Sequence, residues 1–262
     1  MSDIKPTVSV IIPAYNEEDH LLITWEKTAA VLAAETADYE IIIVDDGSAD
    51  RTGGIADGIA AKDPHTRVIH NRGNQGFGFT CRQGIKSARL DFTGWISADT
   101  AWDPAVLKKV IGMLGQYDII TAYTANSYNR PLFRRIISVA FTTTLNILFG
   151  LRLRYYNGAC FHRTALLQAI PLRSSGFTLW AEAVIRLVNQ GYRCYEIGGN
   201  FDDRKSGRSK AFKIKNILGT LKILGVLVKD IHFINSSGLN PPVTSALIRP
   251  VPGRQGDQEK CL

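Results

Sequence analysis

Short apolar runs, mostly of β-branched residues, alternate with helical patterns through the first half of the chain. The runs that predict strands lie at 7–12, 40–44, 68–70, 93–99 and 118–122. An uninterrupted β-branched run is typical of a strand that is buried on both faces of a parallel sheet. Because these strands alternate with helices, the pattern predicts an α/β fold: a Rossmann-like, mostly parallel sheet flanked by helices.

Polar capping residues mark the expected helix starts. Asn16 is expected to cap the first helix, and Ser48 or Asp50 the second, by accepting backbone N–H groups that lack partners. Asp103 followed by Pro104 marks a later helix start, since proline is favoured in the first turn.

The second half of the chain has a different pattern. Helices are predicted at 134–150 and 177–190, a last strand at 191–197 and an amphipathic helix at about 212–231. Residues 236–262 hold several prolines and few large apolar residues, which is typical of a flexible tail. The predicted regions are an α/β domain, an amphipathic helical segment and a tail, at 1–211, 212–235 and 236–262.

The apolar residues of the last helix form one stripe, because they recur at three- and four-residue steps. Lys215, Lys222 and Lys229 recur every seven residues and therefore lie along another face. Lysines on one face and aliphatic residues on the other are typical of a helix that lies in a membrane interface. The alternative is that the stripe packs on the protein's own core or on a second subunit, so the oligomeric state stays open.

Charge is distributed unevenly along a chain whose formal net charge is +7. Residues 119–181 contain no Asp or Glu, and their seven arginines are Arg130, Arg134, Arg135, Arg152, Arg154, Arg163 and Arg173. A basic second half suits a substrate with phosphates, a membrane surface or a nucleic acid. The chain has no aromatic-basic recognition motif, and acids gather in its first half, so we expect no nucleic-acid partner.

The sequence also predicts a cytoplasmic location. Residues 1–6 are polar and do not resemble a signal peptide, and the cysteines show no CxxC spacing. The longest uncharged run, between Arg135 and Arg152, has sixteen residues. A spanning helix needs roughly 18 or more apolar residues. We therefore expect a peripheral protein on the cytosolic face of a membrane.

Carboxylates follow three of the predicted strands. Glu17 comes after the first strand, Asp45 and Asp46 after the second, and Asp99 after the fourth. The carboxyl ends of parallel strands share one edge, where ligands bind in open α/β sheets. Acids there can hydrogen-bond a base and a ribose, or hold a divalent metal that binds a diphosphate. The alternative is that Asp45 and Asp46 are only turn and cap residues.

The loop after the third predicted strand is rich in glycine. Gly73, Gly76 and Gly78 are expected to let the backbone approach a ligand closely, although their spacing matches neither common nucleotide-binding fingerprint. His70, which precedes this loop, has no partner at a recognisable spacing. We interpret it, like the other histidines, as a surface or packing residue.

Several motifs resemble a known family. Val10-Ile-Ile-Pro-Ala-Tyr-Asn-Glu17, Ile43-Val-Asp-Asp-Gly-Ser48 and Ser97-Ala-Asp99 resemble the nucleotide-sugar-binding half of family 2 glycosyltransferases, which have the GT-A fold. Arg134-Arg-Ile-Ile-Ser138 and Asp203-Arg-Lys-Ser-Gly-Arg-Ser-Lys210 are similar to motifs of the polyprenol-phosphate sugar synthases, such as the dolichol-phosphate mannose synthases. The resemblance covers roughly residues 6–210.

This resemblance implies a hexosyltransferase that moves a sugar from a nucleotide-sugar donor to a polyprenyl (dolichyl or undecaprenyl) phosphate in glycan biosynthesis. The residues expected at the donor nucleotide are Pro13, Tyr15, Glu17, Asp45, Asp46 and Gly76. The expected catalytic residues are Asp99, Arg204 and Lys210, with Asp99 also the ligand of a Mg²⁺ or Mn²⁺ ion. Arg134 and Ser138 are expected to hold the acceptor phosphate.

A phosphate acceptor needs no general base, because a lipid monophosphate is already anionic at neutral pH. Its oxygen can displace the nucleoside diphosphate from the anomeric carbon in line, with inversion. The protein must then supply positioning and must stabilise the leaving group. Two alternatives stay open, since Ser97-Ala-Asp99-Thr-Ala101 keeps a single acid of the family's metal motif. One is a same-fold enzyme that acts on a glycan hydroxyl, with Asp103 as its candidate base. The other is a non-catalytic protein that binds nucleotide sugars or membranes.

Overall fold

The computed structural model of the chain describes residues 5–99, 102–126, 132–156, 158–199 and 214–231. The predicted tail and the predicted basic loop, with Arg204 and Lys210, lie outside the described residues. The side chains of Arg134 and of residues 214–218 also lie outside the description.

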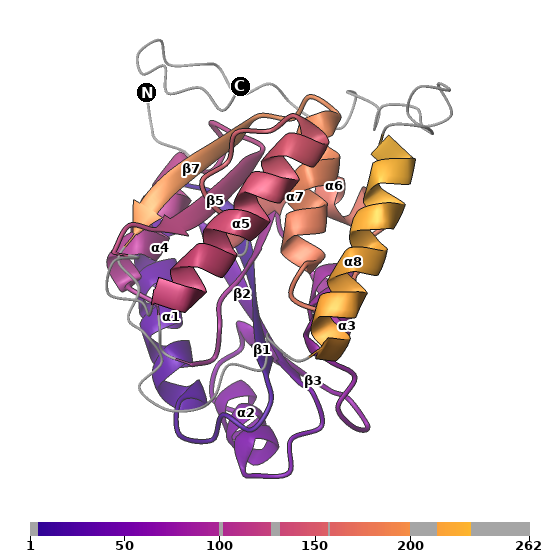
Figure 1. The fold of residues 1–262 in the computed structure, drawn as a ribbon. Coiled ribbons are helices and arrows are strands. Elements are labelled where there is room, and N and C mark those ends of the chain that lie inside the picture. Colours follow the sequence, from indigo (N-terminus) through magenta and orange to yellow (C-terminus); the bar gives the residue numbers. More distant parts are fainter. Residues whose placement is uncertain (1–4, 100–101, 127–131, 157, 200–213, 232–262) are drawn as a thin grey trace.

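The described elements alternate as the sequence predicted for its first half (Figure 1). The strands are β1 (Thr7–Ala14), β2 (Asp38–Asp45), β3 (Thr66–His70), β4 (Phe92–Trp95), β5 (Ile119–Thr124), β6 (Cys160–Arg163) and β7 (Cys194–Gly199). The helices are α1 (Leu21–Glu35), α2 (Thr52–Ala60), α3 (Phe77–Ser87), α4 (Pro104–Met113), α5 (Leu132–Phe149), α6 (Thr164–Ala169), α7 (Leu179–Asn189) and α8 (Ile214–Lys229).

The strands form one seven-stranded sheet in the order β3-β2-β1-β4-β6-β5-β7. β6 is antiparallel to β4 and β5, and the other neighbouring strands pair in parallel. The sheet is therefore mostly parallel, as predicted. The sequence did not predict β6 or α6, because β6 has only four residues, Cys-Phe-His-Arg, and runs directly into the helix.

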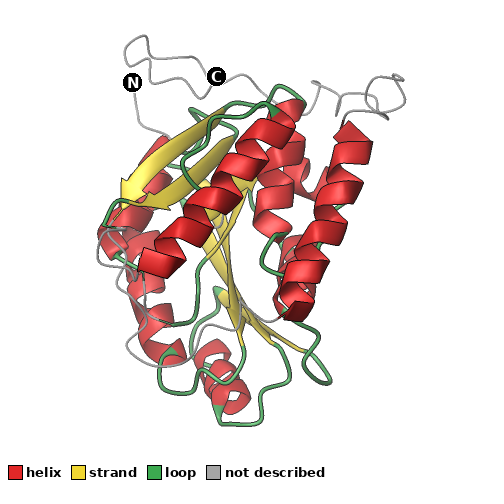
Figure 2. Cartoon of the chain, viewed as in Figure 1, coloured by secondary structure: helices red, strands yellow, loops and turns green. Residues whose placement is uncertain are grey.

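Helices cover both faces of the sheet (Figure 2). Ile41 and Ile43 pack with residues of α1, α2 and α4 on one face, whereas Ile42 and Val44 pack with residues of α3, α5, α6 and α7 on the other. Successive strand side chains point to opposite faces. The unbroken apolar run of β2 thus contributes to two cores, as the sequence predicted.

β1 continues through Pro13, where the sequence predicted that it would stop. The carbonyl of Ile11 accepts the N–H of Ile96 on the β4 side, and β4 pairing ends with Trp95 opposite Ile11. Residues two apart in a strand direct their backbone groups to the same side. The backbone of Pro13 therefore faces the β4 side, like that of Ile11, but beyond the end of β4. The missing N–H of Pro13 thus costs the sheet no hydrogen bond.

The described part of α8 packs on the protein's own core. Leu227 is 1% exposed, and Leu224, Val228 and Ile231 pack against the cluster that contains α7. Asp230, just beyond the helix, forms an ion pair with Arg186 of α7 at 2.8 Å. These residues of the apolar stripe are used for packing, whereas Leu221 is 59% exposed. Contact of the helix with a membrane stays a prediction. Lys222 and Lys229 remain exposed.

Packing of α3 on β1 gives a first testable prediction. A Cβ at Gly84 would come within 2.6 Å of the side chain of Ile11, which is 0% exposed. Gly84→Ala should lower the free energy of unfolding by about 1–3 kcal/mol, the usual effect of overpacking. Gly58→Ala in α2, where a Cβ meets nothing within 4 Å, should raise it by roughly 0.5–1 kcal/mol. Urea denaturation measures both, and a Gly84→Ala variant as stable as Gly58→Ala would contradict this packing.

Candidate functional site

The carboxyl ends of β1, β2, β3 and β4 lie along one edge of the sheet, because these strands are parallel neighbours. The chain places β2 on one side of β1 and later β4 on the other, so the strand order reverses between β1 and β4. Ligands of open α/β sheets bind beyond the strand ends at such a point. Glu17 follows β1, Asp45 ends β2 and Asp99 follows β4. The sheet therefore brings these predicted residues to the same edge.

Hydrogen bonds join the loops after β1 and β2. The N–H of Asn16 donates to Ser48 Oγ at 3.0 Å, and the N–H of Ala49 donates to Asn16 Oδ1 at 2.9 Å. The N–H of Glu17 donates to Thr52 Oγ1 at 2.9 Å. Asn16, whose φ is 55°, is thus a cross-link between two loops. It is not the cap of α1 that the sequence predicted.

Asp50 also joins the loops after β1 and β2, through hydrogen bonds to both of its carboxylate oxygens. Its Oδ1 accepts the N–H of Thr52, the first residue of α2, at 3.0 Å, and its Oδ2 accepts the N–H of Glu18 at 3.3 Å. Burial would raise the pKa of Asp50, but the hydrogen bonds from Thr52 and Glu18 hold this pKa below its usual value. Of the two predicted caps of α2, Asp50 is the one that satisfies a helix N–H.

Asp46 holds the glycine-containing loop after β3. Its side chain is almost completely buried; Oδ1 accepts the Asn71 Nδ2 amide at 2.8 Å and the Gln75 N–H at 2.9 Å. Oδ2 accepts the N–H of Gly76 at 2.8 Å. Both oxygens therefore act in ordering the loop, as the turn interpretation expected. A direct contact of Asp46 with a nucleotide stays a prediction.

The glycines of this region bring backbone close to backbone. A Cβ at Gly47, whose φ is +68°, would lie 2.5 Å from Gly73 Cα. A Cβ at Gly78 would lie 2.5 Å from the carbonyl carbon of Ser175, whose oxygen accepts the Gly78 N–H at 3.1 Å. These glycines let the loops after β2, β3 and α6 pack against one another. The N–H groups of Gly76 and Gly78 have partners within the protein. Close approach of this loop to a ligand stays a prediction.

Asp45 is held from two sides. It is 5% exposed, its Oδ1 accepts the N–H of Ser48 at 3.1 Å, and its Oδ2 lies 3.1 Å from Nδ1 of His70. Nε2 of the same ring lies 2.9 Å from Oδ1 of Asp57. The bonds to Asp57 and Asp45 raise the pKa of His70 above its ordinary value, although burial acts in the opposite direction. His70 does lie at the surface, but its ring has two carboxylate partners that the sequence did not predict.

Asp99 lies in the loop beyond β4. This loop is fixed by the N–H of Ile96, which donates to Ile11 O at 2.9 Å, and by the Oγ1 of Thr24, which donates to Ala98 O at 3.0 Å. Asp99 itself is partly buried. Within the described ranges, no group of three or more His, Cys, Asp or Glu side chains could hold a metal ion. The role of Asp99 as a metal ligand stays a prediction.

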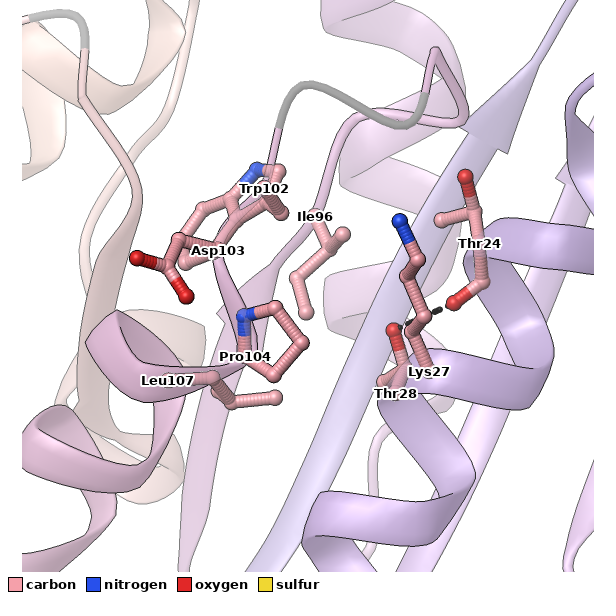
Figure 3. A pocket seen from close by; sticks show the side chains of 8 residues that line it. All are labelled: Thr24, Lys27, Thr28, Ile96, Trp102, Asp103, Pro104 and Leu107. Atoms are coloured by element: carbon pink, nitrogen blue, oxygen red, sulfur yellow. Dashed lines mark hydrogen bonds between the residues drawn. The ribbon is translucent and has the colours of Figure 1, made fainter. Parts of the chain in front are cut away.

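A pocket lies below this loop, between α1 and the start of α4 (Figure 3). Lys27 and Thr24 line it from the α1 side, and Trp102 and Asp103 from the other. Asp103 Oδ1 accepts the N–H of Ala105 at 2.9 Å and so caps α4, as predicted. The one carboxylate that the sequence offered as a general base thus has a structural partner.

The predicted acceptor residues are only partly described. Ser138 lies on α5 and is partly buried, whereas the side chain of Arg134 and the whole of Arg204 and Lys210 lie outside the description. Among the other arginines of the acid-free segment, Arg154 donates from Nη1 to the Tyr123 hydroxyl at 2.6 Å. Because most of these residues lie outside the description, the grouping of the predicted acceptor and donor residues stays a prediction.

The chain is similar to curated proteins that act on polyprenyl phosphates. It is 28% identical over 214 residues to an undecaprenyl-phosphate mannosyltransferase of Micrococcus luteus, a match that covers 78% of this chain and 86% of the relative. It is 34% identical over 141 residues to an undecaprenyl-phosphate 4-deoxy-4-formamido-L-arabinose transferase of Pectobacterium carotovorum. That match covers 53% of this chain and 42% of the relative.

Solved structures share the fold. Glucosyl-3-phosphoglycerate synthase of Mycobacterium tuberculosis, in complex with uridine diphosphate, superposes with a TM-score of 0.63 at 17% identity, covering 84% of this chain and 80% of that one. The same enzyme with Mn²⁺, UDP-glucose and phosphoglyceric acid gives a TM-score of 0.58 at 16% identity, covering 90% and 81%.

A family model connects the sequence motifs to this fold. The model described as "Glycosyl transferase family 2" matches residues 9–169, a range that includes the loops after β1, β2, β3 and β4. The resemblance of the sequence motifs is thereby confirmed, and the chain belongs to glycosyl transferase family 2.

Proposed function

We propose that this protein transfers a sugar from a nucleotide-sugar donor to the phosphate of a polyprenyl phosphate at the cytosolic surface of a membrane. The observation that carries the donor half is the pair of joined loops after β1 and β2, where Asp45 is held in one orientation and Glu17 and Asp99 lie on the same edge of the sheet. The relatives named for polyprenyl-phosphate sugar transfer support the acceptor half.

In this proposal the donor lies across the carboxyl ends of β1, β2 and β4. Asp45 accepts an N–H of the base, and Pro13, Tyr15 and Glu17 line the nucleotide. A buried carboxylate that is already fixed by two hydrogen bonds can recognise a base without first being ordered. Asp46 and Gly76 contribute by holding the loop after β3 against this edge.

The reaction itself is a displacement at the anomeric carbon. An oxygen of the acceptor phosphate forms the new bond to C1 as the bond from C1 to the nucleoside diphosphate breaks, and the configuration inverts. The nucleophile carries its charge already, so no proton has to be removed. This agrees with the capping role of Asp103. Arg204 and Lys210 then stabilise the leaving diphosphate, since cationic side chains bind phosphate strongly.

A divalent ion fits this site only together with the donor. Asp99 is the single acid of the motif, and the described residues form no self-sufficient metal site. Mg²⁺ is commonly held by one or two carboxylates, substrate phosphates and water. We propose that Asp99 supplies the protein ligand of a weakly bound Mg²⁺ or Mn²⁺, which neutralises charge on the diphosphate. Related solved structures contain Mn²⁺ or Mg²⁺ with UDP.

Transfer into lipid tests the function. Protein, polyprenyl phosphate and a panel of radiolabelled nucleotide sugars should give chloroform-extractable label with at least one donor. Asp99→Asn should lower this turnover by about 100-fold, the usual effect of removing one group that stabilises transition-state charge. Asp91→Asn, at the amino end of β4 and so on the opposite edge of the sheet, is the matched control and should keep wild-type turnover. Absence of labelled lipid with every donor would contradict the proposal.

The acceptor role of Arg134 can be tested separately. Arg134 and Ser138 are one helical turn apart on α5, a spacing that places them on one face. Arg134→Ala should raise the KM for lipid phosphate about tenfold or more, since a charge-assisted bond is lost, and leave the KM for the nucleotide sugar unchanged. The neighbouring, exposed Arg135 provides the matched Arg135→Ala control. Equal effects of Arg134→Ala on both substrates would exclude the acceptor role.

The apolar contact with the membrane is better assigned to α5 than to α8. Large apolar side chains of α5 are exposed by 58–77%. They are Leu132, Phe133, Ile136, Val139 and Ile147. Buried in a bilayer interface, such side chains stabilise binding by roughly 25 cal/mol for each Å² removed from water. No helix in the described ranges is long and apolar enough to cross a membrane, so we propose that α5 lies on the surface, close to the acceptor headgroup.

Flotation with anionic liposomes tests this assignment. The wild type should float, and Ile136→Glu with Val139→Glu should release it, because both side chains lose their apolar contact and gain like charge with the lipid. Leu22→Glu with Ile23→Glu on α1, where both residues are 45% exposed, is the matched control and should float as wild type. If the α5 variant floats normally, α5 is not the membrane contact.

A further inference from the structure

His70 stands beside Asp45 because of strand register. In the parallel pair of β2 and β3, Asp45 and His70 are register partners, and partners in register have side chains on the same face of a sheet. Nδ1 of His70 lies 3.1 Å from Asp45 Oδ2. The contact thus joins the last residue of each strand at the edge where the candidate site lies.

The ring of His70 bridges two carboxylates. Its Nε2 lies 2.9 Å from Asp57 Oδ1 on α2. An ionised carboxylate can only accept hydrogen bonds, whereas a neutral imidazole has one donor and one acceptor nitrogen. Both contacts are satisfied only when the ring carries two protons. The geometry therefore favours the imidazolium form, in agreement with the raised pKa of His70.

The His70 ring lies at the surface between two carboxylates and next to a glycine. Among the residues that the structure describes, the charged groups that face His70 are Asp45 of β2 and Asp57 of α2. From α2, Gly53 lies over the pair; a Cβ there would be 3.1 Å from Asp45 Oδ2 and 3.5 Å from His70 Cε1. The His70 side chain remains 43% exposed, so it can exchange protons with solvent and can be replaced without opening the core.

We propose that His70 is a positioning residue, which as an imidazolium holds the carboxylate of Asp45 for recognition of the donor base and ties it to α2 through Asp57. This inference rests on the proposed function, in which Asp45 binds the nucleotide. With Ser48 N–H on Oδ1 and His70 on Oδ2, the carboxylate plane is fixed before the donor arrives. When the ring loses its second proton, only one of its two nitrogens still donates, so the ring no longer ties Asp45 to Asp57.

Donor binding and the contribution of the bridge to folding should both weaken as pH rises. The pKa of His70 is raised in the folded protein above its ordinary value of about 6.5. The bridge therefore contributes fully below the ordinary value and is lost as pH rises through the raised value. Both donor affinity and the contribution of the bridge to folding should fall in that window.

Isothermal titration calorimetry with UDP and with GDP, on the full chain between pH 6 and 9, tests the proposal. At pH 6, His70→Gln should bind the nucleotide about tenfold more weakly than wild type, because a bond to a charged group is lost. This difference should shrink as pH rises. The phosphates of the ligand titrate alike with every variant, so the difference between wild type and His70→Gln isolates the histidine. Asp57→Asn should move the midpoint of the wild-type decline to lower pH.

His65→Gln is the matched control. His65 is 44% exposed and lies 3.3 Å from Asp63, away from Asp45, so this variant should follow the wild-type profile. If His70→Gln binds as wild type does at every pH, or if NMR titration of the His70 ring gives an ordinary pKa, the inference is overturned. If the wild type binds neither nucleotide, the proposed function fails instead, and the two failures are thereby distinguished.

Discussion

The candidate site depends on the need of strand-end loops to pair their backbone N–H groups. Where β1, β2 and β3 stop, the ladder of the sheet no longer supplies acceptors, and buried N–H groups without partners are strongly unfavourable. Side-chain oxygens of neighbouring loops accept these N–H groups instead. Asp46 accepts from Gln75 and Gly76, Ser48 from Asn16, and Thr52 from Glu17. The three loops are thereby fixed relative to one another.

This constraint divides the acidic residues by role. Asp46 and Asp50 accept backbone N–H groups of the loops, and Asp103 accepts one of a helix start. Asp45 is different, because one of its oxygens faces a side chain that can gain or lose a proton. In the motif Asp45-Asp46, both oxygens of Asp46 thus order the loop after β3, whereas Asp45 also contacts His70.

The sequence predicted the elements that are determined by residues close together in the chain. The β-branched runs predicted the parallel strands, and Asp103-Pro104 predicted the start of α4. β6 was missed because four residues carry too little periodicity. His70 was missed because Asp45 and Asp57 become its partners only through strand register and helix packing. For α8, an apolar stripe fits both a membrane and the protein's own core, and the packing of Leu227 near α7 depends on contacts that the sequence does not show. The predicted roles of Arg204 and Lys210 stay predictions.

In the proposed reaction, an anionic lipid phosphate attacks the anomeric carbon directly, without a general base. NMR of the purified product tests it most directly, with whichever nucleotide sugar is consumed. The expected product is a sugar joined to the lipid phosphate, with a ³¹P signal typical of a phosphodiester and an anomeric configuration opposite to that of the donor. A product with retained configuration, or with the sugar on a hydroxyl and the lipid phosphate unchanged, would contradict it.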